Sequence, residues 1–483
     1  MSSFAHTPII FWFRQDLRLS DNPALDAAIK TGQPVLPVFI LDDETQGEWK
    51  RGRASRWWLH YSLSELSRAL GVLNSRLLLR RGPSGGALKA VIEETGASAV
   101  FWNRCYEPFN CERDRLIKTH LTQNGLDVRS FNGALLAEPW TVRNKSGDPF
   151  RVFSPFWRSV RSGLDPGHPL KAPEKILSPK KWPASERLES WKLLPENPDW
   201  AEHFKSVWSP GEAGARHRLE AFFDHGAKHY AGDRDRPDKP YTSGLSPHLH
   251  FGEISPRQII SATDSVREDI GDKNAEKFLS ELGWREFSYG LLFNFPDLPR
   301  SNYQLKFDRF PWRDDPRALK AWQRGQTGYP MVDAGMRELW TTGWMHNRVR
   351  MITASFLIKH LMIDWREGEK WFWDTLVDAD LANNSASWQW VAGSGADAAP
   401  YFRIFNPITQ GEKFDPEGDY VRKWVPELAR LPDKYLNQPW DAGPLILNEA
   451  GVALGKTYPA PIIDHKTARE RALEAFQSLK ETA

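Results

Sequence analysis

Five short apolar segments in the first 135 residues constrain the fold of this chain most strongly. They are IIFWF (9–13), PVLPVFIL (34–41), SRLLL (75–79), ASAVFW (97–102) and DVRSF (127–131). Runs of this length that are apolar at successive positions are typical of strands buried on both faces of a parallel sheet. Helical segments separate them: Asn22-Pro23 is a helix-start signal before ALDAAIK, and SRWWLHYSLSELSRAL has helical spacing. Residues 1–135 are therefore predicted to form an α/β domain with a doubly wound, Rossmann-like parallel sheet.

The rest of the chain changes character twice. The first apolar run is followed by FRQDLRLSDN and not by a glycine-rich turn, so the usual dinucleotide fingerprint is missing and a large cofactor is expected elsewhere. Residues 136–205 are rich in Pro, Ser, Lys and Trp with little sustained periodicity, which predicts a long linker that packs over the surface. Helix signals dominate residues 206–483, ending in DHKTARERALEAFQSLK, so we expect an all-α second domain.

Composition excludes several classes of protein. A chain of 483 residues with 40% hydrophobic content can bury a large core, and no stretch approaches the eighteen apolar residues of a membrane span. Without a charged leader, a cytoplasmic location is expected. Only Cys105 and Cys111 are present, so four-cysteine metal sites and a disulfide scaffold are excluded; no metal and an organic cofactor are expected. The net charge of +2 leaves a nucleic-acid partner open.

Four segments of the second domain carry chemically useful side chains. TSGLSPHLHFGEISP (242–256) contains two Ser-Pro helix starts, Ser246-Pro247 and Ser255-Pro256, which could hold a phosphate or simply cap helices. FLSELGWREF (278–287) aligns Glu281, Trp284 and Arg285 on one helical face, as a site or as a surface ion pair over a core Trp. GWMHNRVRM (343–351) likewise aligns Asn347 with Arg350 and Met351 and leaves Arg348 turned aside. DADLANNSASWQW (378–390) combines carboxylates, carboxamides and tryptophans with little ordinary core.

These segments together resemble the photolyase/cryptochrome family. TSGLSPHLHFGEIS, ELGWREF, TGYPMVDAGMREL, TGWMHNRVRM, DWREGE, DADLANN, WQW and DAAPYFRIFNP occur in the family's order along essentially the whole chain. GRASRWWLHYSL (52–63) and WNRCYEP (102–108) look closest to plant cryptochromes and to class III cyclobutane pyrimidine dimer photolyases. The resemblance implies an α/β domain joined by a long linker to a helical domain that binds FAD.

The resemblance also implies the residues that contact FAD. The positions that match the family's cofactor contacts are Tyr230, Thr242, Ser243, Gly244, Leu245, Ser246, Phe278, Glu281, Arg285, Asn347, Arg350, Asp378, Asp380 and Asn384. Asp378 and Arg350 are expected to form a buried ion pair, because each charge needs a partner away from water. Asn384 matches the side chain that the family sets against flavin N5.

The activity that the resemblance implies is light-dependent repair of UV-damaged DNA, in which excited, reduced FAD lends an electron to a pyrimidine dimer flipped out of the duplex. The residues matched to the catalytic pocket are Glu281, Trp284, Asn347, Met351, Asn384 and Trp390. Those matched to DNA contacts are Trp284, Asn347, Arg348, Trp390, Arg403 and Gln410. The protein is expected to act as a monomer, associated with the nucleoid when bound to DNA.

Two further predictions concern the route of electron transfer and the antenna chromophore. Trp388, Trp365 and Trp312 match the family's electron-transfer triad, although core packing explains each tryptophan taken singly; Trp371 and Trp373 could supply a branch. Methenyltetrahydrofolate is the antenna implied by the resemblance, but CYEPFNCERD (105–114) lacks the Asn-Glu pair that holds folate in the best-known bacterial photolyases. Residues 51–58 are a candidate wall of that pocket, or a helix face packed on the sheet.

Three classes of function remain open: a deoxyribodipyrimidine photolyase, a cryptochrome-type blue-light photoreceptor, and a flavoprotein that binds DNA without repair. Plant-type receptors carry a long tail and an Asp beside flavin N5, whereas this chain has Asn384 there and ends soon after its final helical segment. Repair of (6-4) photoproducts would need a His pair where Met345-His346-Asn347 stands. Dimer photolyase is therefore the function that we expect.

Overall fold

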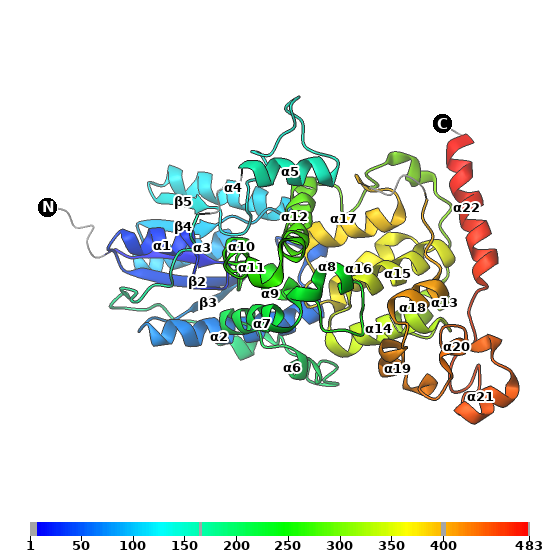
Figure 1. The fold of residues 1–483 in the computed structure, drawn as a ribbon. Helices are drawn as coiled ribbons and strands as arrows, with labels where there is room; N and C mark the ends of the chain where they lie inside the picture. The colour runs from blue at the N-terminus through cyan, green and yellow to red at the C-terminus, as the bar shows by residue number, and fades with distance from the viewer. Residues whose placement is uncertain (1–6, 164–166, 398–401, 482–483) are drawn as a thin grey trace.

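A computed structural model describes residues 7–163, 167–397 and 402–481 of the chain (Figure 1). The DAAPYFRIFNP motif overlaps residues 398–401, which lie outside the described residues, whereas Arg403 lies within them. Figure 1 shows an α/β unit at one end of the molecule and a larger helical unit at the other, with the C-terminal helix at the far edge.

The α/β unit contains a five-stranded, fully parallel sheet in the order β3-β2-β1-β4-β5. The strands are β1 (Ile9–Phe13), β2 (Val35–Leu41), β3 (Leu78–Arg81), β4 (Ala99–Asn103) and β5 (Asp127–Phe131). Strand β3 begins three residues later than the apolar run suggested, and the other four lie close to the predicted ranges. The helices of this unit are α1 (Pro23–Lys30), α2 (Arg53–Val72), α3 (Ser84–Thr95) and α4 (Pro108–Gln123). The predicted doubly wound fold is confirmed.

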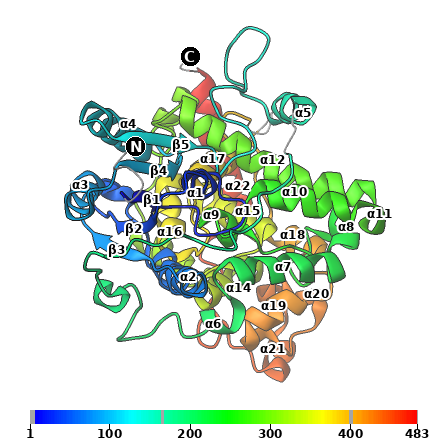
Figure 2. The ribbon, with the colours of Figure 1, turned by 90° about the vertical axis from the view of Figure 1, so that its left-hand side faces the viewer.

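The strands are apolar at every position because each face of the sheet packs on its own core. In β1, Ile9, Phe11 and Phe13 belong to one hydrophobic cluster, whereas Ile10 and Trp12 belong to another. Alternate side chains of a strand point to opposite faces, so both sets must be apolar when helices cover both faces. The end-on view in Figure 2 shows helices on both sides of the sheet.

The predicted linker contains a helix that the sequence did not reveal. Helix α5 (Phe153–Gly163) packs against α12 (Asp272–Asn294), and a short 3-10 helix (Leu188–Trp191) and the short helix α6 (Phe204–Val207) follow before the second domain. The contact is close: a Cβ at Gly283 would lie 2.5 Å from the Trp157 ring. Segment 136–205 is therefore not wholly irregular, because part of it forms a wall of the helical unit.

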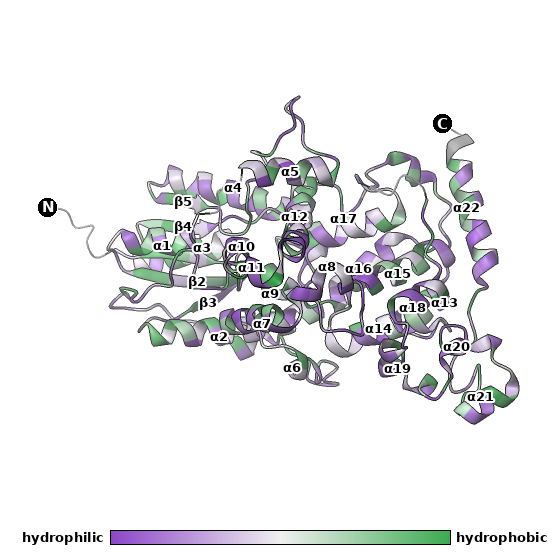
Figure 3. Ribbon diagram, in the orientation of Figure 1, coloured by the Kyte–Doolittle hydropathy of each residue, from purple (hydrophilic) through white to green (hydrophobic). Residues whose placement is uncertain are grey.

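The remaining helices form the larger unit. They are α7 (Glu212–His225), α8 (Tyr230–Asp233), α9 (Ser246–His250), α10 (Pro256–Ser265), α11 (Arg267–Ile270), α12 (Asp272–Asn294), α13 (Pro316–Gln323), α14 (Pro330–Thr342), α15 (Asn347–Ser355), α16 (Trp365–Thr375), α17 (Leu381–Ala392), α18 (Pro407–Phe414), α19 (Asp419–Trp424), α20 (Asp433–Leu436), α21 (Pro444–Ala450) and α22 (His465–Glu481). The segment that runs from α14 to α17, with the connections between these helices, supplies most of the largest core cluster. In Figure 3 the strands are mainly green, whereas α22 is banded purple. Within the described ranges, no helix is both long and apolar enough to cross a membrane.

Candidate active site

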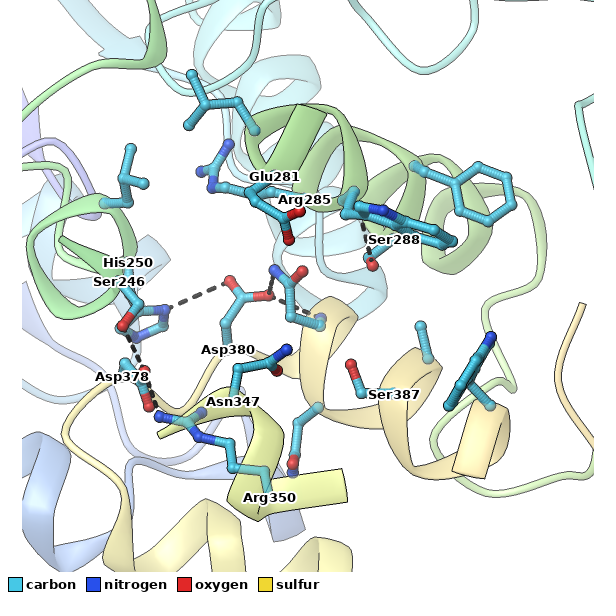
Figure 4. A pocket seen from close by; sticks show the side chains of 18 of the residues that line it. Ser246, His250, Glu281, Arg285, Ser288, Asn347, Arg350, Asp378, Asp380 and Ser387 are labelled. Atoms are coloured by element: carbon cyan, nitrogen blue, oxygen red, sulfur yellow. Dashed lines mark hydrogen bonds and ion pairs between the residues drawn. The ribbon is translucent and has the colours of Figure 1, made fainter. Parts of the chain in front are cut away.

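A cavity of about 510 Å³ lies inside the helical unit, between α9, α12, α15 and α17 (Figure 4). Its volume falls in the range of pockets that hold cofactors and drug-sized ligands. The predicted site residues that line it are Tyr230, Ser243, Leu245, Ser246, Phe278, Glu281, Trp284, Arg285, Asn347, Arg350, Met351, Asp378, Asp380, Asn384, Trp388 and Trp390. Most of the side chains selected from scattered motifs thus meet around one space.

Helical spacing explains how α12 and α15 supply the wall. Glu281, Trp284 and Arg285 all line the cavity from α12, as expected for positions i, i+3 and i+4. Asn347, Arg350 and Met351 do the same from α15, and the intervening Arg348 is directed elsewhere. Figure 4 shows the labelled side chains of the two helices directed into the space between them.

Asp378 forms the predicted ion pair with Arg350, with its Oδ2 2.8 Å from the Arg350 Nη2. Ser246 Oγ donates a second hydrogen bond to the same oxygen, at 2.5 Å (Figure 4). The other carboxylate oxygen, Oδ1, is buried and has no protein partner. A buried acceptor without a partner costs free energy, so this oxygen fits a donor supplied by a polar ligand in the cavity.

Asp380 caps α17 and joins three segments of the chain. Its Oδ1 accepts from the backbone N–H of Asn383 at 2.9 Å, and its Oδ2 accepts from the Tyr289 hydroxyl at 2.5 Å. His250 Nδ1 lies 3.4 Å from the same oxygen. Burial opposes ionisation of Asp380, but its interactions with His250, Arg285 and Tyr289 outweigh burial and hold its pKa well below the usual range. A fixed negative charge therefore lies beside the cavity.

The loop before α9 differs from the prediction at one position. Ser246 is the first residue of α9 and donates to Asp378, so it does not cap the helix; Leu245 occupies the cap position. The helix start predicted at Ser255-Pro256 is confirmed, because Ser255 and Gln258 form a reciprocal capping box at the start of α10. Thr242 and Gly244 flank lining residues without lining the cavity, and Gly244 has a φ of +61°, which suits glycine.

Asn384 lies against a buried acid that the motifs did not reveal. Its side-chain Nδ2 donates to the backbone oxygen of Glu369 at 3.0 Å. The Glu369 side chain is fully buried; Ser385 donates to its Oε1, and its Oε2 has no partner. Burial raises the pKa of Glu369 to about 8, since the hydrogen bond from Ser385 and the charge of Arg366 offset burial only in part. Glu369 is therefore protonated at neutral pH.

This burial predicts a pH dependence of stability. The pKa of Glu369 is higher in the folded chain than its ordinary value of 4.5, so its contribution is complete below pH 4.5 and is lost as the pH rises through about 8. The loss should be about 1.4 kcal/mol per pH unit in that window. Glu369→Gln keeps the shape without the ionisation. Its free energy of unfolding should match the parent at pH 5 and exceed it at pH 8.5; parallel pH profiles would contradict the assignment.

Trp284 is held in place by a residue of the predicted linker. The Phe153 ring of α5 stacks on Trp284 with a centroid separation of 3.8 Å and an interplanar angle of 8°. One face of the indole is therefore covered by Phe153, and a ligand can stack only on the other. No motif pointed to Phe153, because the contact joins positions 131 residues apart in an irregular segment. Trp390 lines the cavity from α17.

The three predicted electron-transfer tryptophans differ in depth. Trp388 lines the cavity, Trp365 is fully buried and donates to Asn302 at 3.0 Å, and Trp312 is half-buried beside Phe310. Trp388 thus adjoins the cavity and Trp312 reaches the surface, whereas the electron-transfer role of the three tryptophans remains a prediction. A Cβ at Gly368 would lie 2.1 Å from the Trp388 ring, so α16 and α17 approach closely there.

Three further tryptophans, Trp371, Trp373 and Trp322, contact different neighbours. Trp371 stacks on the exposed Trp340, and Trp373 donates to the Lys50 backbone oxygen beside Trp49. Trp322, which the sequence did not single out, has its ring centroid 6.3 Å from that of Trp388. An electron-transfer branch at Trp371 or Trp373 remains a prediction, and the contact of Trp322 with Trp388 adds a third candidate.

The predicted DNA contacts outside the cavity are heterogeneous. Arg403 is exposed, whereas Gln410 is half-buried and its Oε1 is buried without a partner. The Arg348 side chain is only 16% exposed and pairs with Asp235 at 2.6 Å. Arg234, which the motifs missed, lines the cavity and binds the Glu281 carboxylate. The sequence did carry one signal for Arg234, because it lies one helical turn after Tyr230, a predicted site residue.

Comparison with known proteins agrees with this arrangement. Residues 9–174 match the family described as DNA photolyase, and residues 278–478 match the FAD binding domain of DNA photolyase. The first range covers the parallel sheet, and the second includes the α12, α15 and α17 walls of the cavity. The chain belongs to the photolyase/cryptochrome family.

Individual relatives extend the match to nearly the full length. A deoxyribodipyrimidine photo-lyase of Agrobacterium fabrum is 54% identical over 480 residues, which cover 99% of this chain and 100% of that protein. A crystal structure of a bacterial class III photolyase from Agrobacterium tumefaciens superposes with a TM-score of 0.96, covering 99% of each chain at 54% identity. Cryptochrome-1 of Arabidopsis thaliana is 41% identical over 97% of this chain and 70% of its own length.

Proposed function

We propose that this protein is a deoxyribodipyrimidine photolyase that binds FAD in the helical cavity and uses light to split cyclobutane pyrimidine dimers in UV-damaged DNA. The observation that carries the proposal is the convergence of Asp378, Asn384, Trp284 and Trp390 on one cavity in a chain 54% identical, from end to end, to a deoxyribodipyrimidine photo-lyase. FAD, when bound and reduced, supplies the electron that light excites.

The residues of the cavity are suited to hold such a cofactor. Ser243, Leu245 and Ser246 present small groups and backbone at the start of α9, where a phosphate can lie close to the chain. Asp378 offers an unpaired oxygen, and Arg350, held by Asp378, offers guanidinium donors with fixed orientation. Asn384 is anchored by Glu369, so its carboxamide is held rigidly at the cavity wall.

The remaining wall is suited to receive a flipped pyrimidine dimer. Trp284, backed by Phe153, and Trp390 offer aromatic faces, and Met351 adds a deformable apolar contact. Glu281 lines the same space and can bond the polar edge of a base. Damaged bases pair poorly and cost least to flip, so such a pocket selects them over intact duplex.

Replacing Trp284 or Trp390 with Ala tests this arrangement. Stacking on an aromatic side chain contributes about 1–3 kcal/mol per base, so affinity for dimer-containing DNA should fall about tenfold or more. Affinity for intact duplex should change little, because it depends on phosphate contacts. Binding isotherms on both DNAs decide the matter: equal losses would mean that the indoles are general DNA contacts or that the fold has changed.

We also propose methenyltetrahydrofolate as an antenna in the α/β unit. A recess of only about 20 Å³ lies at the carboxyl ends of β1 and β2, where parallel sheets bind ligands, and is lined by Arg51, Trp12, Gln46 and Arg113. A folate would fit there only if these side chains moved apart. No carboxylate of the described residues pairs with the Arg51 guanidinium within 4 Å, which suits an anionic ligand tail. By contrast, Trp57 and Trp58 pack in the core, so the predicted wall at residues 51–58 is reduced to its first residue.

A blue-light receptor is the second candidate, supported by the 41% identity to a cryptochrome. Asn384 favours repair, because a carboxamide cannot deliver a proton to a neighbouring flavin nitrogen as a carboxylic acid can. The experiment that separates the two is an absorption spectrum before and after denaturation, followed by repair of dimer-containing DNA under blue light. Released FAD with repair supports the proposal; released FAD without repair supports the receptor.

A further inference from the structure

A chain of five alternating charges runs along one edge of the cavity. Arg348 of α15 pairs with Asp235 at 2.6 Å, and the other oxygen of Asp235 lies 3.8 Å from Arg234 Nε. Arg234 in turn binds Glu281, which also pairs with Lys277 at 3.3 Å. Lys277, Arg234 and Glu281 line the cavity, whereas Asp235 and Arg348 do not. The chain therefore connects the inside of the pocket to a guanidinium outside it.

Arg348 is held back by more than its ion pair. Its guanidinium lies 4.5 Å from the centroid of the Phe414 ring, and its Nε is buried without a hydrogen-bond partner. With only 16% of the side chain exposed, Arg348 has few donors available to a phosphate while Asp235 holds it. A guanidinium that must first leave a carboxylate gains less from a phosphate than a free one.

We propose that Asp235 is a specificity-determining residue that withholds Arg348 from DNA phosphates until a lesion in the cavity engages Glu281. This inference rests on the proposed function, because it assigns the occupant of the cavity to a pyrimidine dimer. When Glu281 bonds the lesion, Arg234 loses its closest carboxylate and turns to Asp235, which is already 3.8 Å away. Asp235 then shares its charge with Arg234, and Arg348 is released toward the DNA backbone.

Binding of a lesion at Glu281 and binding of a phosphate by Arg348 are coupled, because intact and damaged DNA make different contacts, and this coupling is reciprocal. Intact duplex does not reach Glu281, so it meets an Arg348 that remains paired, whereas damaged DNA meets a free one. By linkage, releasing Arg348 in advance must remove part of the advantage of damaged DNA. Asp235 thus lowers binding to the large excess of intact DNA at little cost to binding of lesions.

Asp235→Asn is the direct test, with Asp233→Asn as the matched control. Both changes remove one negative charge from the same segment, but within the described residues the Asp233 carboxylate has a single ion-pair contact, with His229 at 3.9 Å. In Asp235→Asn, affinity for intact duplex should rise about fivefold, the order expected for one more phosphate contact, and affinity for dimer-containing duplex should change less than about twofold. The slope of log K against log salt on intact duplex should steepen by about 0.9. Asp233→Asn should leave the ratio of the two affinities unchanged.

Glu281→Gln supplies an independent arm. It frees Arg234 for Asp235 without a lesion, so affinity for intact duplex should rise as in Asp235→Asn, while affinity for dimer-containing duplex falls. Thermal stability serves as the folding control for each variant, and FAD content serves as a second one for Asp235→Asn and Asp233→Asn. The proposal is overturned if Asp235→Asn shifts both DNAs equally, if it weakens both, or if Asp233→Asn has the same effect. A parent protein without preference for dimers would instead refute the proposed function itself.

Discussion

Trp365→Phe should photoreduce oxidised FAD at least about tenfold more slowly than the parent, yet repair dimers at the parental rate once its flavin is chemically reduced. Phenylalanine keeps an aromatic ring in a site where Trp365 is fully buried, but its radical cation forms far less readily. A rise of only about 1.4 kcal/mol in the barrier of a hopping step slows it tenfold. Repair itself returns its electron to the flavin and should not need the route through Trp365.

Two measurements check this separation: the photoreduction rate with an external donor, and single-turnover repair with dithionite-reduced protein. Because Phe cannot donate the hydrogen bond that Trp365 gives to Asn302, Asn302→Ala controls for loss of that 3.0 Å contact and should photoreduce normally. Unchanged photoreduction in Trp365→Phe would mean a parallel route or a wrong assignment. Adding Trp322→Phe, whose ring lies 6.3 Å from Trp388, distinguishes them: loss only in the double variant identifies a branch.

Asp378→Ala should abolish most FAD binding. It leaves the Arg350 guanidinium and the Ser246 hydroxyl without their shared partner in a site where the Asp378 side chain is 3% exposed. The variant also deletes the buried Oδ1 acceptor, and a hydrogen bond to a charged group contributes about 1.5–3 kcal/mol, which corresponds to a loss of affinity of about tenfold to 100-fold. Apoprotein titrated with FAD gives the dissociation constant directly.

Asp374→Ala is the matched control for that variant. Asp374 lies four residues earlier and pairs with Arg53, but both side chains are substantially exposed, so the pair should contribute about 0–1 kcal/mol. FAD affinity and thermal stability should change little. If Asp378→Ala bound FAD as tightly as Asp374→Ala, the ion pair would be a feature of the core and not of the cofactor site.

The sequence predicted the α/β unit well because burial on both faces leaves a local record. Every residue of β1 and β2 is buried, so the apolar runs mark the strands within one or two residues. Strand β3 was placed too early, since only Leu78 and Leu79 of the run SRLLL enter it. Helix α5 was not predicted, because its eleven residues lie between segments rich in Pro and Lys that favour irregular structure. Its packing partner is α12, which is distant in the sequence.

The sequence predicted the site residues that share one helix. It did not predict the contacts between residues that are far apart in the sequence. Spacing placed Glu281, Trp284 and Arg285 on one face without further information. The support of Asp380 by Tyr289, of Trp284 by Phe153 and of Asn384 by Glu369 depends on tertiary packing, which no local pattern records. These supporting residues hold the predicted ones in fixed positions, as a preorganised site requires.

The most direct test of the account is single-turnover repair of an oligonucleotide with one cyclobutane thymine dimer by chemically reduced protein under blue light. The account predicts loss of the dimer and recovery of thymine absorbance in the light, none in the dark, and none with an oligonucleotide that carries a (6-4) photoproduct. Dimer loss that proceeds equally in the dark, or a dimer that persists in the light although the protein contains reduced FAD and binds the lesion, would contradict it.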